Sequence, residues 1–397
     1  MAGDYPGGVV QVWNAQTGRQ LTKIKTSGYS YDIVESYSHP TPDWDAIYVS
    51  RRGKRMHTRI EKEGKKLIRW EFEGDVCAWD LKTGELRENY QHAPPRGIRL
   101  VELSPDGSTF VTSEELPGEW SGVPKQTTSL WNARTKQYRS LDQRLNPYGT
   151  FSPDSRTVAF TTHSDFARNN YTTGIKLFDV ETGREKLSIS IPGECSSLAR
   201  VLFSPKADIV VGHLSVRTKR DSHENWQSYL TFWETTSGKR IASFPADEKS
   251  SDFALPLFSP DGQTLATTNF YRAKNKLYLF NVTDRKLRST TLLGEGDTTY
   301  VKPPVFSPDG NWIAVITQVF PKYLQVRDPA VEDAPQPRIH LIDVATGELR
   351  ETLIAPQGFT ASASFSPDGK TLATGGHGKV LLWDFTTPPG TEVRHVR

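Results

Sequence analysis

The chain has 397 residues, 11% of them aromatic, so it can build a large buried core and is too rich in rings to be disordered. Its net charge of +3 excludes a strong positive field over the whole protein, and its two cysteines exclude both a disulfide framework and a cysteine-rich metal site. No apolar run could span a bilayer as a helix, and residues 1–8 show no secretory signal. We therefore expect a cytoplasmic protein without membrane contact.

The first repeated motif is an apolar residue followed by Ser-Pro-Asp-Gly. Pro presets φ for the first corner of a tight turn, Asp tolerates the second, and Gly supplies the positive φ that follows. Short runs typical of strands flank each copy, so each predicts a β-hairpin. The seven copies, the first of them degraded, lie at residues 41–43, 103–107, 151–154, 203–205, 258–262, 306–310 and 365–369.

The second motif alternates with the first and reads apolar-x-aromatic-Asp/Asn-x-x-Thr-Gly. Several copies are imperfect, yet each still predicts a strand, a turn and another strand. It occurs eight times, beginning at Val12, Ala78, Leu130, Leu177, Phe232, Leu279, Leu341 and Leu382.

Each repeat of roughly 52 residues therefore predicts four short antiparallel strands, A and B around the Ser-Pro turn and C and D around the Thr-Gly turn. A single sheet this short cannot bury both faces, whereas successive sheets stacked around an axis can. No stretch has helical periodicity with a cap at each end. We expect an all-β fold.

The two motifs together resemble the bacterial Trp-Asp (WD) repeat family of β-propellers, over residues 8–386. Periplasmic Tol-type propellers share the Ser-Pro-Asp-Gly turn but less of the Trp-Asp strand, and they are the second alternative. The resemblance implies one β-propeller domain, residues 1–397, made of four-stranded antiparallel blades.

The number of blades follows from the seven A strands, which favour seven blades over residues 28–387. The N-terminal segment, residues 1–27, adds a C and a D strand and begins inside a blade. These strands either close the ring by completing the last blade, which we prefer, or belong to an incomplete eighth blade. Residues 388–397 are expected to be a C-terminal tail.

The connections between strands B and C vary widely in length, and in repeat proteins insertions on one face usually mark the binding face. They carry aromatic rings beside arginines, a composition typical of interface cores. The predicted partner-binding residues are Arg51, Arg52, Arg55, Arg59, Arg69, Trp70, Trp120, Tyr171, Trp226, Tyr271 and Tyr323.

The first of these insertions, residues 51–73, has nine basic residues against four acidic ones. Its excess of five positive charges is larger than the net charge of the whole chain. The run Lys66–Phe72 has the composition of a strand, so the segment is expected to extend strands B and C as a hairpin.

A second, weaker set of candidates lies near the inner strands, where the family has its central channel. These residues are Asp32, Arg99, Arg200, Asp252 and Lys302.

Catalytic motifs such as Gly-x-Ser-x-Gly and His-Glu-x-x-His are absent from the sequence. The resemblance therefore implies a monomeric, non-catalytic scaffold that binds a protein partner on the face of the B–C loops, with no metal or cofactor and no nucleic acid. Two alternatives remain open. The first is an enzyme at the channel mouth, lactonase-like or dehydrogenase-like, and the second is binding of nucleic acid or another anionic polymer by the hairpin 51–73.

Overall fold

The computed structural model of the chain describes residues 2–4, 9–13, 20–25, 38–62, 65–91, 98–115, 118–119, 126–141, 145–146, 148–162, 173–191, 195–217, 226–246, 252–254, 256–270, 275–294, 299–319, 336–356, 362–376, 379–385 and 393–396. The chain divides into two compact units. The first comprises Gly3–Asn14 and Gln20–Ile191 together with Met1, and the second comprises Pro192–Arg397 together with Ala2 and Ala15–Arg19.

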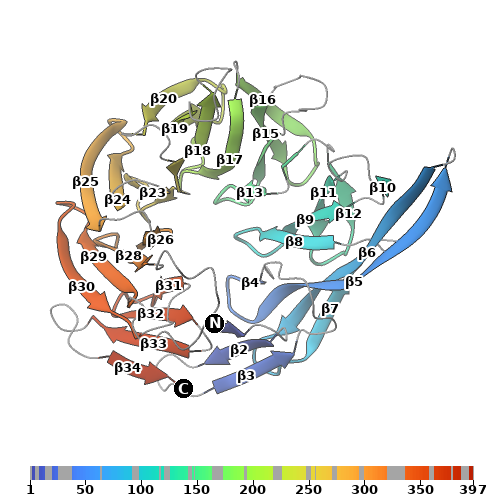
Figure 1. Cartoon of the computed structure of the whole chain (residues 1–397), viewed down its shortest axis with the longest axis horizontal. Helices are drawn as coiled ribbons and strands as arrows, with labels where there is room; N and C mark the ends of the chain where they lie inside the picture. The colour runs from blue at the N-terminus through green and yellow to red at the C-terminus, as the bar shows by residue number, and fades with distance from the viewer. Residues whose placement is uncertain are drawn as a thin grey trace. The chain divides into compact units, whose positions relative to one another are not determined.

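Within these ranges the elements are strands, and they form eight antiparallel sheets (Figure 1). The prediction of an all-β chain built from short antiparallel hairpins is confirmed. None of the described residues belongs to a helix, so that part of the chain contains no helix that could cross a membrane.

The first four sheets follow one another along the chain, and in the second to fourth of them strands A to D are neighbours in that order. The first sheet consists of β1 (Ala2–Asp4), β2 (Val9–Trp13) and β3 (Gln20–Lys25). The second consists of β4 (Ser38–Pro40), β5 (Ala46–Lys62), β6 (Lys65–Asp80) and β7 (Leu86–Tyr90), with β10 (Gly118–Glu119) added on β6. The third consists of β8 (Ile98–Leu103), β9 (Thr109–Glu115), β11 (Gln126–Asn132) and β12 (Tyr138–Ser140). The fourth consists of β13 (Thr150–Phe151), β14 (Thr157–Thr161), β15 (Thr173–Asp179) and β16 (Glu185–Ile191).

The second unit repeats the same order in four further sheets. The fifth sheet consists of β17 (Cys195–Phe203), β18 (Ile209–Arg217), β19 (Trp226–Glu234) and β20 (Arg240–Pro245). The sixth consists of β21 (Asp252–Phe253), β22 (Leu257–Phe258), β23 (Thr264–Phe270), β24 (Asn275–Asn281) and β25 (Lys286–Gly294). The seventh consists of β26 (Thr299–Val301), β27 (Val305–Phe306), β28 (Trp312–Val319), β29 (Arg338–Asp343) and β30 (Leu349–Ile354). The eighth consists of β31 (Ser362–Phe365), β32 (Thr371–Gly376), β33 (Lys379–Asp384) and β34 (Val393–Val396).

The inner strand of the sixth sheet and that of the seventh sheet are each divided into two pieces. β21 and β22 both pair with β23, and β26 and β27 both pair with β28. Pro256 lies between β21 and β22, and Pro303 and Pro304 lie between β26 and β27. Proline has no N–H to donate to the strand ladder, so it interrupts the pairing.

The two ends of the chain differ from the expectation that the N-terminal strands complete the last blade and that residues 388–397 form a tail. The last sheet takes its fourth strand from β34, inside the segment expected to be a tail, and the N-terminal strands form a three-stranded sheet of their own. Seven of the eight sheets have an inner strand. The blade count is therefore seven or eight, depending on whether the three-stranded sheet is counted.

The Ser-Pro-Asp-Gly turns have the predicted geometry, as the turn around Gly262 illustrates. The N–H of Gly262 donates to the carbonyl of Ser259 over 2.9 Å, and Gly262 has φ +71°. The Ser259 hydroxyl donates to Asp261 over 2.5 Å and accepts the N–H of Thr264 over 2.9 Å. This hydrogen bond from Ser259, together with the N–H of Gln263, lowers the pKa of the Asp261 carboxyl. The Asp261 carboxylate is therefore charged, and in this form it stabilises the turn by accepting both hydrogen bonds.

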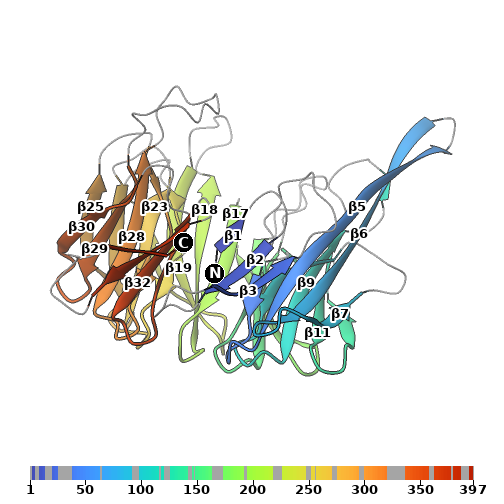
Figure 2. The same cartoon turned by 90° about the horizontal axis from the view of Figure 1, so that it is seen from below.

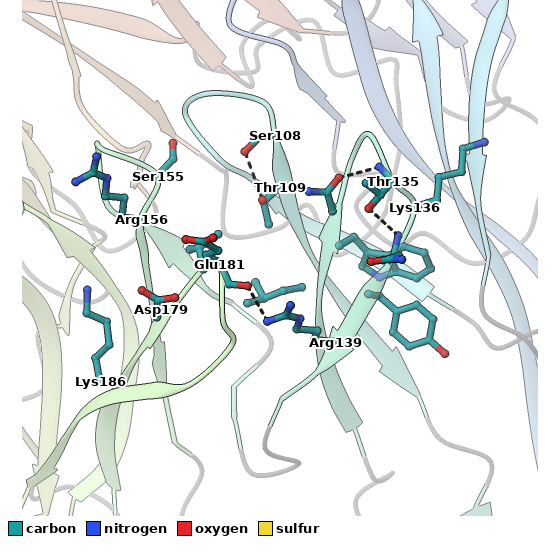
Figure 3. A pocket seen from close by; sticks show the side chains of 16 residues that line it. Ser108, Thr109, Thr135, Lys136, Arg139, Ser155, Arg156, Asp179, Glu181 and Lys186 are labelled. Carbon is teal, nitrogen blue, oxygen red and sulfur yellow. Dashed lines mark hydrogen bonds between the residues drawn. The ribbon is translucent and has the colours of Figure 1, made fainter.

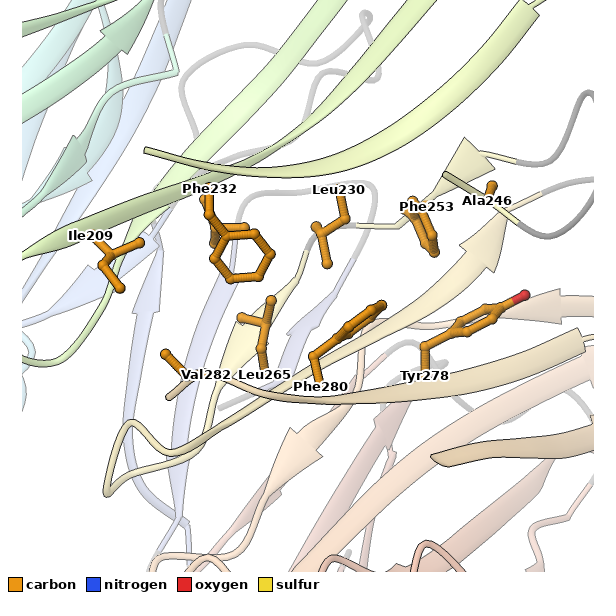
Figure 4. Close-up of a cluster of buried hydrophobic side chains, with 10 residues drawn as sticks. Ile209, Leu230, Phe232, Ala246, Phe253, Leu265, Tyr278, Phe280 and Val282 are labelled. Atoms are coloured by element: carbon orange, nitrogen blue, oxygen red, sulfur yellow. The ribbon is translucent and has the colours of Figure 1, made fainter. Parts of the chain in front are cut away.

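Neighbouring sheets pack face to face, and each interface within a unit has its own apolar cluster. Figure 4 shows the cluster between the fifth and sixth sheets, where Phe232 and Leu230 face Phe280 and Leu265. Alternating apolar positions on strands B and C supply most of these side chains, which is the strand periodicity that the sequence shows. The antiparallel order places the A–B and C–D turns at one end of each sheet, while strand B ends and strand C begins at the other end.

Candidate functional site

A cleft of about 1120 Å³ lies between the third and fourth sheets of the first unit, at the end where the turns are (Figure 3). One wall comes from β11, β12 and the turn that joins them. The other comes from the Ser-Pro turn and the Thr-Gly turn of the fourth sheet. The cleft is therefore built by two successive repeats.

Two aromatic residues form the wall on the third sheet. Trp131 of β11 and Tyr138 of β12 are partners in register, and their ring centroids are 4.7 Å apart. Trp131 is only 1% exposed, and its indole N–H donates to the hydroxyl of Thr112 over 2.9 Å. Tyr138 is 40% exposed. Tyr138 thus covers the buried tryptophan on the face of the third sheet that points toward the second sheet, and it bounds the cleft only at the edge of this wall.

The cationic side chains of Arg139, Arg156 and Lys186 line the cleft, and two of the three donate hydrogen bonds to other residues of the protein. Arg139 donates to the backbone carbonyl of Glu181 over 2.7 Å, and Lys186 donates to the hydroxyl of Thr157 over 3.1 Å. The guanidinium of Arg156 makes no hydrogen bond or ion pair with any residue in the described ranges. Arg156 can therefore bind an anion without breaking a hydrogen bond to a described residue, although its charge also attracts the Asp154 carboxylate.

The acidic groups around the cleft are ionised at neutral pH. Asp179 accepts hydrogen bonds from the N–H and the hydroxyl of Thr182, and these bonds lower the pKa of its carboxyl. A hydrogen bond from Ser152 lowers the pKa of Asp154, and the charges of Arg156 and Lys186 add to that effect. The cleft therefore offers both charged donors and charged acceptors.

A fourth cation, Lys136, is already engaged. Its ammonium group forms an ion pair with Glu88 of the second sheet. Lys136 also adopts a left-handed φ of 59°, at the position where five other repeats have glycine. An aromatic surface, forked donors and carboxylate acceptors together suit a ligand rich in hydroxyl groups that also carries a negative charge.

Comparisons with known proteins identify the fold. The family profile for the WD domain, G-beta repeat, matches residues 347–384. A dihydro-heme d1 dehydrogenase, NirN, solved in complex with DHE, matches 99% of this chain and 72% of its own, with 15% identity and a TM-score of 0.61. The chain is a WD-repeat-like β-propeller. An oligogalacturonate lyase solved in complex with manganese matches 87% of the propeller and 85% of its own chain, with 12% identity and a TM-score of 0.53. No curated protein matches the sequence.

These comparisons contradict the expectation of a non-catalytic scaffold and the expectation that the propeller is not an enzyme. Two of the solved structures that share its fold are named as a lyase and a dehydrogenase. The sequence misled us because a propeller enzyme can collect its reactive residues from several blades. No single segment then contains a catalytic motif.

The predicted partner-binding residues cannot be assembled into a site. Residues Trp120, Tyr171, Tyr271 and Tyr323 lie outside the described residues. The backbone, without the side chains, is described for Arg51, Arg52, Arg55, Arg59, Arg69, Trp70 and Trp226, which lie in β5, β6 and β19. Binding of a partner at these residues stays a prediction.

The predicted channel-mouth residues are likewise only partly described. Asp32 lies outside the described residues, and only the backbone is described for Arg99 in β8 and Asp252 in β21. Arg200 in β17 and Lys302, which follows β26, are both half-buried. A role for these five residues in chemistry stays a prediction.

The sequence does not predict the cleft, because the variation in length that usually marks a binding face lies in the B–C connections and not in the turns. One signal could have revealed it. The third repeat has Lys136 where the Thr-Gly motif expects glycine, and the fourth has Ser155 where the Ser-Pro-Asp-Gly motif expects it. Both of these residues line the cleft, so the departures from the repeat mark its position.

Proposed function

We propose that this propeller is an enzyme and that the polar cleft binds its substrate, an acidic oligosaccharide. The observation that carries the proposal is the guanidinium of Arg156, which lines the cleft without a hydrogen bond or ion pair to any described residue. A guanidinium presents two parallel donors that match a carboxylate. A ligand carboxylate is therefore its natural partner.

The remaining lining groups suit the rest of a sugar. At the edge of the cleft, on the side of the second sheet, the ring of Tyr138 offers an apolar face against which the C–H groups of one sugar unit can pack. Asp179 and Glu181 can accept hydrogen bonds from sugar hydroxyls, and Arg139 adds a second guanidinium on the opposite wall. The cleft volume of about 1120 Å³ accommodates several sugar units.

The likeness to the oligogalacturonate lyase supports this choice of substrate, since that protein is named for an oligosaccharide of acidic sugars. The lyase structure also contains manganese. Within the described ranges of this propeller, no three His, Cys, Asp or Glu residues lie close enough together to hold a metal ion. The described residues therefore do not fit a metal site, and we assign no step of the proposed reaction to a metal.

The reaction that this arrangement suits best is an elimination. A base removes the proton on the carbon next to the sugar carboxylate, the bond from the adjacent carbon to the glycosidic oxygen breaks, and that oxygen takes up a proton. A C=C bond conjugated to the carboxylate forms, and nothing is oxidised or reduced overall. A guanidinium beside the carboxylate stabilises the negative charge that develops on it, which is the role we assign to Arg156.

The test measures binding of trigalacturonate by calorimetry and its cleavage by the ultraviolet absorbance of the new C=C bond. Removing the charge with Arg156→Gln should weaken binding about tenfold or more, because a charge-assisted hydrogen bond is lost. The matched control is Lys370→Gln, which changes the same turn position in the last repeat. Trigalacturonate that neither binds nor is cleaved, or an Arg156→Gln variant that binds it as well as the wild type, would refute the proposal.

A further inference from the structure

The second sheet carries a long ribbon that is absent from the described residues of the other sheets. β5 and β6 pair without interruption except for one bulge, from Ala46 opposite Asp80 to Lys62 opposite Lys65. β4 pairs with β5 only at Ile47–Val49, and β7 pairs with β6 only at Val76–Trp79. Figure 2 shows β5 and β6 extending well past β9 and β11. We call residues 51–62 and 65–75 the ribbon, and the predicted extension of strands B and C is confirmed.

The ribbon is mostly an isolated two-stranded structure. Its one further strand partner in the described ranges is β10, which pairs two residues, Gly118 and Glu119, with Trp70 and Arg69. At about 3.3 Å per residue the eleven residues 52–62 reach roughly 35 Å. Two-stranded hairpins are marginally stable in water, and a ribbon of this length has far more surface than a small ligand would need.

The register separates the ribbon residues into two faces. On one face Arg55 lies opposite Phe72, His57 opposite Trp70, and Arg59 opposite Ile68. Positions bearing arginine thus alternate along this face with positions bearing rings. On the other face, Thr58 lies opposite Arg69 and Ile60 opposite Leu67.

Cross-strand acidic partners offset only part of the positive charge of the ribbon, because Asp75 lies opposite Arg51, Glu61 opposite Lys66, and Glu119 of β10 opposite Arg69. The residues opposite Arg55 and Arg59 are apolar, and the last pair places Lys62 opposite Lys65. Like charges directly opposite one another destabilise a hairpin. The segment 51–73 has five more basic than acidic residues, whereas the whole chain has a net charge of only +3. The excess is therefore concentrated on the ribbon, and an anionic ligand would relieve it.

We propose that the ribbon binds an acidic polysaccharide, the polymeric form of the substrate class proposed for the cleft, and this inference rests on that proposed function. Arginines spaced from Arg51 to Arg59, roughly 26 Å at about 3.3 Å per residue, suit a repeating series of carboxylates, and the ring positions between them suit the apolar faces of sugars. The small net charge of the chain disfavours a general nucleic-acid binder, which needs a wide positive field.

The ribbon and the cleft lie at opposite ends of their sheets, so ligands of different length can be used to tell binding at one from binding at the other. The ribbon extends from the end of the second sheet opposite to its Thr41–Asp45 turn, whereas the cleft lies at the turn end of the third and fourth sheets. A short oligosaccharide in the cleft cannot also reach the ribbon, but a long polymer can contact both. The ribbon should therefore matter for polymers and not for trimers.

The experiment compares binding of polygalacturonate and of trigalacturonate to the full chain at low and high salt. The ribbon variant carries Arg55→Ser, Arg59→Ser and Arg69→Ser, and the control variant carries Arg240→Ser and Arg350→Ser in the second unit. Circular dichroism and thermal melting verify that each variant is folded. We expect the ribbon variant to lose polymer affinity about tenfold or more, with weaker salt dependence, while its trimer affinity changes less than about twofold.

The outcomes separate this inference from the proposed function. Unchanged polymer affinity, or an equal loss for trimer and polymer, overturns the ribbon proposal alone. A wild type that binds the polymer through the ribbon but does not bind the trimer overturns the cleft function. A wild type that binds neither overturns both. Tighter binding of single-stranded DNA than of polygalacturonate, abolished by the same substitutions, replaces the polysaccharide with a nucleic acid and overturns the proposal as stated.

Discussion

The hydroxyl of Tyr90, at the end of β7, donates a hydrogen bond over 2.7 Å to the backbone carbonyl of Ala133 in the next sheet. Burial raises the pKa of this hydroxyl, so it remains protonated and able to donate. Equivalent bonds run from Thr22 of β3 to the carbonyl of Leu81 and from Arg139 of β12 to the carbonyl of Glu181. An outer strand thus repeatedly anchors the Thr-Gly turn of the sheet that follows it.

Removing the hydroxyl with Tyr90→Phe should lower the free energy of unfolding by about 1–3 kcal/mol, because the ring stays packed while the Ala133 carbonyl loses a donor. Denaturant titration followed by tryptophan fluorescence measures the change. The control is Tyr229→Phe, which removes a hydroxyl that makes no hydrogen bond to a residue in the described ranges. Equal stability of the two variants would show that the bond to Ala133 adds nothing.

The close packing of Gly262 on the preceding repeat predicts a second stability difference. A Cβ atom on Gly262 would lie 3.0 Å from Cδ of Pro205, whereas one on Gly310 would lie 3.7 Å from Cδ of Pro260. Both glycines have a positive φ, 71° and 73°, so alanine is strained at either position. Gly262→Ala should therefore cost more than Gly310→Ala, which should itself cost about 1 kcal/mol. Thermal melting of both variants tests the difference, and the reverse order would contradict it.

The repeat geometry was predictable because its determinants are local. The serine, proline, aspartate and glycine of a turn such as Ser259–Gly262 make their hydrogen bonds to one another, so a short stretch of sequence contains the whole cause of the structure. The extension of β5 and β6 was predictable for the same reason, since strand periodicity runs through it.

The cleft and the end of the chain were not predictable in this way. The cleft brings together Tyr138, Arg156 and Asp179, which lie in three different segments and share no motif. Their proximity depends on how two sheets pack, which no single segment encodes. The strand Val393–Val396 has only four residues, too few to show a period. The absence of a local catalytic motif does not exclude an enzyme, because a propeller can collect reactive residues from several blades.

The indole of Trp79 predicts a stabilising substitution. Trp131 and Trp383 each donate to a threonine hydroxyl over 2.9 Å, but the indole nitrogen of Trp79 is buried without a partner. The register places Val49 where the other two repeats have their threonine. Val49→Thr should raise the free energy of unfolding by about 0.5–1.5 kcal/mol. Denaturant titration measures it, with Thr112→Val as the reciprocal variant that should lose stability. A less stable Val49→Thr variant would refute the argument.

His340 predicts how stability depends on pH. Its ring lies between the hydroxyls of Thr317 and Thr352, and burial, helped by the charge of Arg338, lowers its pKa to about 4. The unfolded chain takes up a proton at this residue near pH 6.5, whereas the folded chain does so only near pH 4. The contribution to stability is therefore complete above pH 6.5 and declines as the pH falls toward 4, by up to about 1.4 kcal/mol per pH unit. The variant His340→Gln should show a shallower loss of stability between pH 7 and pH 4.5, and an unchanged slope would contradict the assignment.

Tyr138 connects the packing of the third sheet to the proposed substrate. Its ring covers Trp131 on one side and is 40% exposed on the other, so the proposal gives it the role of a surface on which a sugar packs. That role needs the ring and not the hydroxyl. Tyr138→Phe should therefore bind trigalacturonate within about twofold of the wild type, while Tyr138→Ala should bind it about tenfold more weakly. The control is Leu349→Ala, which removes an exposed side chain at the equivalent position of β30, opposite Ile342. Calorimetry with all three variants, each verified as folded by circular dichroism, makes the comparison. If Tyr138→Phe and Tyr138→Ala lose affinity equally, the hydroxyl and not the ring is what the sugar contacts, and the stacking role of Tyr138 is wrong.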